Sequence, residues 1–112
     1  MTFDEYQAEA IKTRKGSADA MYLAAKLPIE AGEAAQHIVK EAYHGKAVDV
    51  AQLAEELGDL AWYIANLCDF YGLSFDVIAA QNVAKLRARH GDSYNAAHYQ
   101  GGAQGGAQDG AQ

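Results

Sequence analysis

Residue types that cross-link, bend or anchor a chain are scarce in this sequence. Its 112 residues include one cysteine, Cys68, which cannot form a disulfide within the chain, and one proline, Pro28. No uncharged run approaches the length of a membrane span, and residues 1–9 lack the basic and apolar pattern of a leader. We therefore expect a cytoplasmic protein that makes no membrane contact.

Positive charge is also scarce. Nine Lys and Arg residues stand against fifteen Asp and Glu residues, so the formal net charge is -6. Binding along a nucleic-acid polymer requires a basic face that displaces counterions from phosphates, and this composition disfavours that role. A phosphate ligand would have to be held through a metal ion or by a local basic pocket.

Half of the residues are hydrophobic, and the length is about that of one ordinary domain, which together indicate a folded chain. Apolar residues recur every three or four positions, the period of an amphipathic helix, and no alternating strand pattern occurs. Pro28 either kinks the second predicted helix or lies in the first turn of a new one. Helices are predicted from residue 3 to near Gly16, from Asp19 to His44, from Asp49 to Gly72 and from Ser74 to Gly91.

These helices predict an all-α, four-helix-bundle-like domain over residues 1–99. Residues 100–112 consist mainly of Gly, Ala and Gln, and we expect them to form a flexible tail. Four helices in so short a chain leave apolar surface unburied. We therefore expect a homo-oligomer, either a dimer or a tetramer.

Two pairs of acidic residues share one spacing. Glu30 and Glu33 are three residues apart, as are Glu56 and Asp59, so each pair lies on one face of its helix. Carboxylates held together repel unless they are protonated or cations lie between them, and such hard oxygen ligands suit Mg²⁺ or Mn²⁺. The same spacing is also typical of a solvated helix face.

Each second acid follows a glycine, Gly32 or Gly58. Glycine inside a helix costs on the order of 1 kcal/mol relative to alanine, which indicates either close approach of a ligand or tight packing against another helix. His37 shares a helix face with Glu33 and Lys40, but a lone histidine of this kind is more often a surface or packing residue.

The order and spacing of these motifs resemble the MazG-like all-α nucleoside triphosphate pyrophosphohydrolases. Glu30-x-x-Glu33 and Glu56-x-x-Asp59, with 22 residues between them, match that family's metal-binding signature. The resemblance covers roughly residues 20 to 95, and Pro28-Ile29 departs from the small or polar residues that family members commonly have there. Four blocks resemble the family in its order: GEAAQHIVK (32–40), YHGK (43–46), EELGDLAWYIANL (55–67) and NVAKLRARHG (82–91).

The resemblance implies a MazG-type fold and hydrolysis of a (deoxy)nucleoside triphosphate between its α- and β-phosphates. The products would be the monophosphate and pyrophosphate, and the reaction would control the nucleotide pool. Bound Mg²⁺ or Mn²⁺ would neutralise the triphosphate and lower the pKa of a bound water, and Glu55 or a metal ligand would orient that water. The metal-binding and catalytic residues implied are Glu30, Glu33, Glu56 and Asp59.

Further residues are candidates for binding the substrate. Lys85, together with Asn82 and Arg89, matches positions that the family uses to hold phosphate or sugar, although cations at a helix end also favour the helix itself. Trp62, Tyr63 and Asn66 are candidates for a base pocket, although aromatic residues at helical spacing are more often part of a core.

The same sequence features are also compatible with a second class of function. A noncatalytic helical module that senses nucleotides or binds a partner would retain the fold and the acids without turnover. Intact acidic pairs and the presence of Lys85 favour the enzyme. The base and the sugar of the substrate stay open, because relatives with the same metal site act on different triphosphates.

Overall fold

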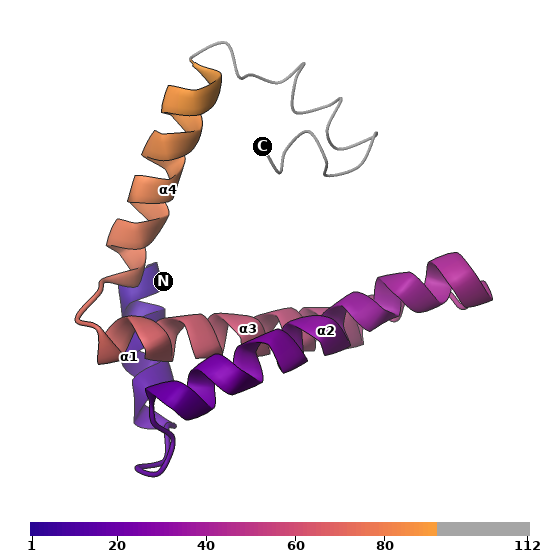
Figure 1. The fold of residues 1–112 in the computed structure, drawn as a ribbon, viewed down its shortest axis with the longest axis horizontal. Helices are drawn as coiled ribbons and strands as arrows, with labels where there is room; N and C mark the ends of the chain where they lie inside the picture. The colour runs from indigo at the N-terminus through magenta and orange to yellow at the C-terminus, as the bar shows by residue number, and fades with distance from the viewer. Residues whose placement is uncertain (92–112) are drawn as a thin grey trace. The chain divides into compact units, whose positions relative to one another are not determined.

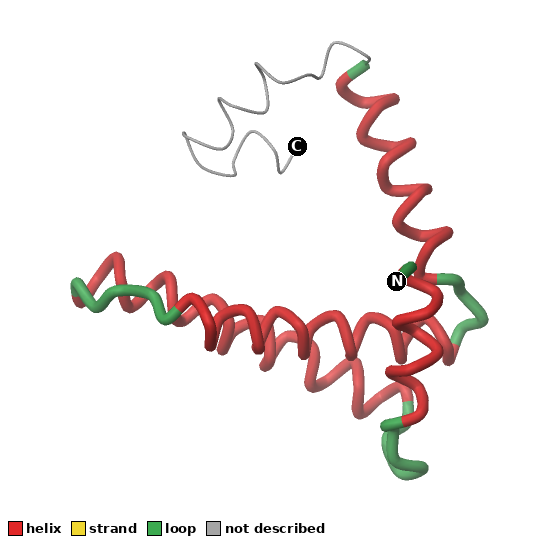
Figure 2. Tube along the Cα trace, turned by 180° about the vertical axis from the view of Figure 1, so that it is seen from behind, coloured by secondary structure: helices red, strands yellow, loops and turns green. Residues whose placement is uncertain are grey.

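The structure, a computed structural model, describes residues 1–91, and all of their regular structure is helical (Figures 1 and 2). No strand occurs within this range, so the prediction of an all-α fold is confirmed. The predicted tail over residues 100–112 lies outside the described residues. The helices are α1 (Phe3–Lys12), α2 (Ala20–His44), α3 (Val50–Phe70) and α4 (Phe75–His90).

The first helix is shorter than its apolar spacing predicted. Thr2 begins α1 through a capping box, in which its side chain accepts from the Glu5 amide while Glu5 accepts from the Thr2 amide. Thr13 follows its last residue, and the Thr13 amide and hydroxyl both donate to the Ala10 carbonyl. These bonds tighten the last turn and end the helix at Lys12 instead of near Gly16.

The second helix is continuous for 25 residues. Asp19 caps its start by accepting from the Tyr22 amide, and Pro28 lies inside the helix, so it does not begin a new one. Gly45 ends it with a φ of 67°, a left-handed conformation that glycine adopts without steric cost. Asp49 then caps α3 by accepting from the Gln52 amide, as the sequence predicted.

The two long helices, α2 and α3, lie antiparallel and side by side, and α1 packs across α3 (Figures 1 and 2). Leu23 and Asn66 are the largest side chains that are fully buried. The buried hydrophobic residues are Ala10, Leu23, Ala34, Ala65 and Cys68.

The chain divides into two compact units, Met1–Asp76 and Val77–Gln112. The first contains α1, α2, α3 and the first two residues of α4. The second is described as far as Gly91 and consists there of the rest of α4. None of the described helices combines the length and the hydropathy that crossing a membrane requires.

Within the first unit, α1 is tied to the residues that begin α4. The Asp76 carboxylate accepts from the amide of Phe3, and the Asp4 carboxylate accepts from the amide of Asp76, so each chain segment caps the other. Ser74 directly precedes α4, as predicted, and its hydroxyl donates to Asp4 at 2.8 Å. The rings of Phe3 and Phe75 stack with centroids 4.6 Å apart.

Candidate functional site

The register of the antiparallel pair brings the two acidic pairs to neighbouring turns of α2 and α3. His37 Nε2 on α2 lies 3.1 Å from Glu56 Oε1 on α3, and the charge of Glu30 acts on Tyr63. His37 is seven positions after Glu30, and Tyr63 is seven positions after Glu56, so one antiparallel register accounts for both the hydrogen bond and the electrostatic effect. Glu33, midway between Glu30 and His37, is therefore level with the residues that follow Asp59.

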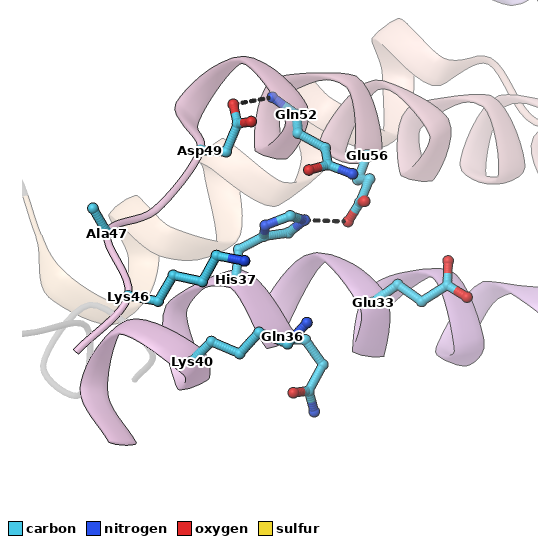
Figure 3. Close-up of a pocket in the computed structure, with 9 residues that line it drawn as sticks. All are labelled: Glu33, Gln36, His37, Lys40, Lys46, Ala47, Asp49, Gln52 and Glu56. Atoms are coloured by element: carbon cyan, nitrogen blue, oxygen red, sulfur yellow. Dashed lines mark hydrogen bonds and ion pairs between the residues drawn. The ribbon is translucent and has the colours of Figure 1, made fainter. Parts of the chain in front are cut away.

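One residue from each acidic pair lines a common pocket of about 380 Å³. Glu33 enters it from α2 and Glu56 from α3 (Figure 3). The other end of the pocket, formed by the last turns of α2 and the loop before α3, carries Lys40 and Lys46. The full lining is Glu33, Gln36, His37, Lys40, Lys46, Ala47, Asp49, Gln52 and Glu56.

The remaining two acids of the signature lie beside this pocket rather than in its lining. The Glu30 carboxylate is 3.6 Å from the Lys26 ammonium, an ion pair one helical turn apart. Asp59 is exposed, and its charge acts on Tyr6 and Tyr63. Within residues 1–91, no three Asp, Glu, His or Cys side chains are arranged so that they could hold a metal ion.

The donor chemistry nevertheless fits a magnesium site that is completed by its ligand. Mg²⁺ in phosphate-processing sites takes one or two protein carboxylates and fills its other positions with water and phosphate oxygens. Glu33 and Glu56 supply two such carboxylates from facing helices, and the pocket between them has room for phosphate. Glu55, the predicted water-orienting residue, is exposed beside Glu56 on α3.

Tyr63 is a neutral phenol in this environment. Burial raises its pKa above the ordinary value of 10.0, and the negative charge of Glu30 raises it further. The Tyr63 ring meets the Trp62 ring edge to face, with centroids 5.0 Å apart. A protonated tyrosine beside the acidic pairs both donates and accepts hydrogen bonds at neutral pH.

Trp62 lines a second cavity, of about 310 Å³, beside the loop that joins α1 to α2. Its indole N–H donates to Thr13 Oγ1 at 2.7 Å, which holds the ring in the cavity wall. Tyr22 supplies a second aromatic side chain, and Lys15 and Ser17 supply polar groups. The cavity thus combines aromatic and polar walls, as a site for a planar heterocycle requires.

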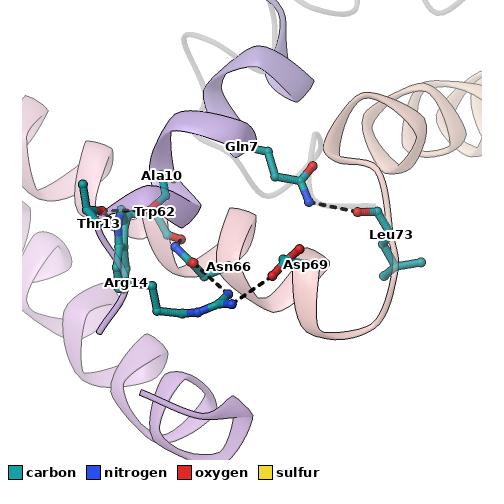
Figure 4. A network of polar contacts seen from close by, with 8 residues as sticks. All are labelled: Gln7, Ala10, Thr13, Arg14, Trp62, Asn66, Asp69 and Leu73. Carbon is teal, nitrogen blue, oxygen red and sulfur yellow. Dashed lines mark hydrogen bonds and ion pairs between the residues drawn. The ribbon is translucent and has the colours of Figure 1, made fainter. Parts of the chain in front are cut away.

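Asn66, the third candidate for the base pocket, lies in neither of these two cavities. Its side chain is fully buried and makes two hydrogen bonds inside the protein (Figure 4). The amide nitrogen donates to the Trp62 carbonyl at 2.9 Å, and the amide oxygen accepts from Arg14 at 3.0 Å. In this conformation Asn66 supports the turn of α3 that carries Trp62.

The glycines that precede Glu33 and Asp59 face open space. A Cβ atom built on Gly32 or on Gly58 would meet no atom within 4 Å in the described part of the chain. Tight packing against another helix of residues 1–91 therefore does not account for either glycine. The space in front of both backbones is free for a ligand or for a second copy of the chain.

The candidates on α4 are all exposed. Asn82, Lys85 and Arg89 lie along this helix in the second unit, where their spacing puts them on one face. The sequence pattern predicts neither Lys40 nor Lys46 as a site residue, and in it His37 is a lone histidine. The signal for Lys40 was its position seven residues after Glu33, on the same helix face.

The chain matches a known protein family over most of its described length. The model of the MazG nucleotide pyrophosphohydrolase domain matches residues 20–93. This range contains α2, α3 and α4, and with them both acidic pairs and every candidate substrate-binding residue. No curated protein and no solved structure matches the chain.

Proposed function

The chain belongs to the MazG nucleotide pyrophosphohydrolase family, and on that premise we propose that it hydrolyses a (deoxy)nucleoside triphosphate to the monophosphate and pyrophosphate. A water oxygen attacks the α-phosphorus, and the bond from that phosphorus to the oxygen that bridges to the β-phosphorus breaks. The attacking water loses a proton, and pyrophosphate leaves. The observation that carries this proposal is the entry of Glu33 and Glu56, one from each acidic pair, into a single pocket.

The four acids of the signature are the proposed metal ligands. Glu33 and Glu56 would hold Mg²⁺ or Mn²⁺ in the pocket, and Glu30 and Asp59, on neighbouring turns, would complete the set when substrate enters. Bound Mg²⁺ neutralises phosphate charge and lowers the pKa of a water. A chain of net charge -6 can bind a polyanion in this way. Glu55 would orient the attacking water or accept its proton.

The nucleoside would be bound by residues around the second cavity. Trp62 lines that cavity with its indole held by Thr13, and this supports stacking of a base on the ring. Tyr63 contacts Trp62 edge to face and is subject to the charge of Glu30, and its neutral hydroxyl would bond to base or sugar. Asn66 would act by holding the Trp62 backbone, and it would contact the base only after its bond to Arg14 opens.

The role proposed for α4 is to bind phosphate or sugar. Lys85, with Asn82 and Arg89, presents a cation and hydrogen-bond donors on one helix face. Most of α4 belongs to the second unit, so contacts with the pocket do not support this role. Its support is that these positions resemble the family pattern and lie within the matched range.

We also propose that the protein is a homo-oligomer. Its buried core is small, while large apolar side chains on the antiparallel pair are exposed, for example Ile38 at 57%, Leu57 at 51% and Ile29 at 52%. Covering such residues against a second copy would remove apolar surface from water. Light scattering coupled to size exclusion measures the expected dimer or tetramer mass, and a monomer would contradict the proposal.

Product analysis tests the reaction. A panel of ribo- and deoxyribonucleoside triphosphates is incubated with Mg²⁺, with Mn²⁺ or with EDTA, and the products are separated. Monophosphate and pyrophosphate are expected with either metal and are lost with EDTA. Glu33→Gln should lower kcat/KM by at least about 100-fold, because even the outer partners of metal ligands contribute 10- to 100-fold. Glu9→Gln, an exposed glutamate on α1, is the matched control and should leave kcat/KM unchanged.

Each alternative has its own result. Monophosphate with separate inorganic phosphates would show stepwise hydrolysis and contradict cleavage after the α-phosphate. Metal-dependent nucleotide binding without turnover of any triphosphate would identify the chain as a noncatalytic nucleotide sensor.

A further inference from the structure

The pocket that contains Glu33 and Glu56 has a positively charged end. Lys40 comes from the last turns of α2, and Lys46 follows Gly45, whose left-handed conformation turns the chain back over that helix (Figure 3). No carboxylate of the described chain is within ion-pairing distance of either ammonium group. Two cations therefore face one cavity without a protein counter-ion among residues 1–91.

Two acids from the same region bond to backbone amides instead of to these lysines. Asp49 lines the same pocket, but its carboxylate accepts from the Gln52 amide at the start of α3. The Glu41 carboxylate accepts from the Val48 amide and so holds the loop between the helices. Lys40 and Lys46 are exposed, and cations without a carboxylate partner at the end of a pocket are positioned for an anion from outside.

The distance between the two ends of the pocket suits a polyphosphate. Lys40 follows Glu33 by seven residues, which is two helical turns or about 10.5 Å along the axis. Glu33 and Lys40 both line the pocket, so this span lies along it. Figure 3 shows Lys46 extended along the pocket towards His37, in the same direction.

We infer that Lys40 and Lys46 bind the β- and γ-phosphates of the substrate, the part that leaves as pyrophosphate. The inference rests on the proposed function for the identity of the substrate. With the α-phosphate beside Glu33 and Glu56, the outer phosphates would extend towards the lysines. When the bond to the α-phosphorus breaks, negative charge grows on the leaving oxygen, and the two ammonium groups stabilise it. The same contacts bind free pyrophosphate.

Binding of inorganic pyrophosphate tests this inference without turnover. Its affinity is measured by calorimetry in the presence of Mg²⁺ for the wild type, Lys40→Met and Lys46→Met, next to the affinity for a deoxynucleoside monophosphate. Each substitution removes one charge-assisted contact and should weaken pyrophosphate binding about tenfold. Binding of the monophosphate, which has no outer phosphates, should change less than about twofold.

Two further variants separate contact from net charge and from folding. Lys12→Met makes the same charge change on α1, away from the pocket, and should leave pyrophosphate binding unchanged. Lys46→Arg retains the cation and should bind pyrophosphate within about threefold of the wild type. Circular dichroism confirms that each variant is folded, as expected for substitutions of exposed side chains.

The results distinguish this inference from the proposed reaction. Equal weakening of pyrophosphate and monophosphate binding, or equal weakening by Lys12→Met, would overturn it. If hydrolysis is normal and neither Lys40→Met nor Lys46→Met changes pyrophosphate binding, the inference is overturned while the proposed reaction is still supported. Pyrophosphate binding that depends on both lysines in a protein without turnover would support it while the proposed reaction fails.

Discussion

Arg14 connects the segment after α1 to the end of α3, and its replacement should destabilise the fold measurably. Its guanidinium donates to Asn66 Oδ1 and to Asp69 Oδ2, each at 3.0 Å (Figure 4). It also lies over the Phe70 ring, 4.4 Å from the centroid. Arg14→Met keeps most of the apolar stem and removes all three contacts.

The contact with Asn66 dominates the expected loss. Asn66 is fully buried, so without Arg14 its amide oxygen loses its donor, which costs about 1–3 kcal/mol. The pair with Asp69 is partly exposed, at 19% for Arg14 and 38% for Asp69, and adds at most about 1 kcal/mol after solvent screening. The cation over the aromatic ring adds about 0.5–1 kcal/mol. The free energy of unfolding should therefore fall by about 2–4 kcal/mol.

Urea denaturation followed by circular dichroism measures this change, with all variants at one protein concentration because assembly would affect apparent stability. Lys12→Met breaks an ion pair whose side chains are 69% and 65% exposed, and it should change the free energy of unfolding by less than about 0.5 kcal/mol. A loss below about 1 kcal/mol for Arg14→Met, or equal losses in the two variants, would refute the assigned role of the buried Asn66 contact.

Three further predictions follow from burial and backbone geometry. Gly32→Ala should raise the free energy of unfolding by about 0.5–1 kcal/mol, because the added Cβ meets no atom within 4 Å. Gly45→Ala should lower the free energy of unfolding by about 1–2 kcal/mol, because Gly45 has a φ of 67°. Urea denaturation measures both changes, and the opposite signs would contradict both predictions. Burial raises the pKa of Cys68 above 9.0, so native protein should resist iodoacetamide at mildly alkaline pH and react once unfolded, as followed by mass spectrometry. Burial and the charge of Glu30 raise the pKa of Tyr63 above 10.0. The free energy of unfolding should therefore fall as the pH rises above that value. Urea denaturation at a series of pH values measures this fall, and an equally steep fall in Tyr63→Phe would exclude Tyr63 as its cause.

Local chemistry in the sequence was enough to predict most of the helices and the candidate acids. Asp49 and Gly45 act within three or four residues of their own positions, so their capping roles were readable without the fold. Glu30 and Glu33 share a helix face because of helical geometry alone. The end of α1 was mispredicted because the hydroxyl of Thr13 bonds to the preceding turn, and apolar spacing does not register such a bond.

Only the tertiary structure decided which of these side chains meet. Spacing along one helix does not determine how that helix is rotated against its neighbour, so the pairing of His37 with Glu56 depends on the register of α2 and α3. The same register puts Glu33 in the pocket with Glu56, and the turn at Gly45 adds Lys46 to it. These contacts join residues far apart in the chain, and periodicity within a helix carries no information about them.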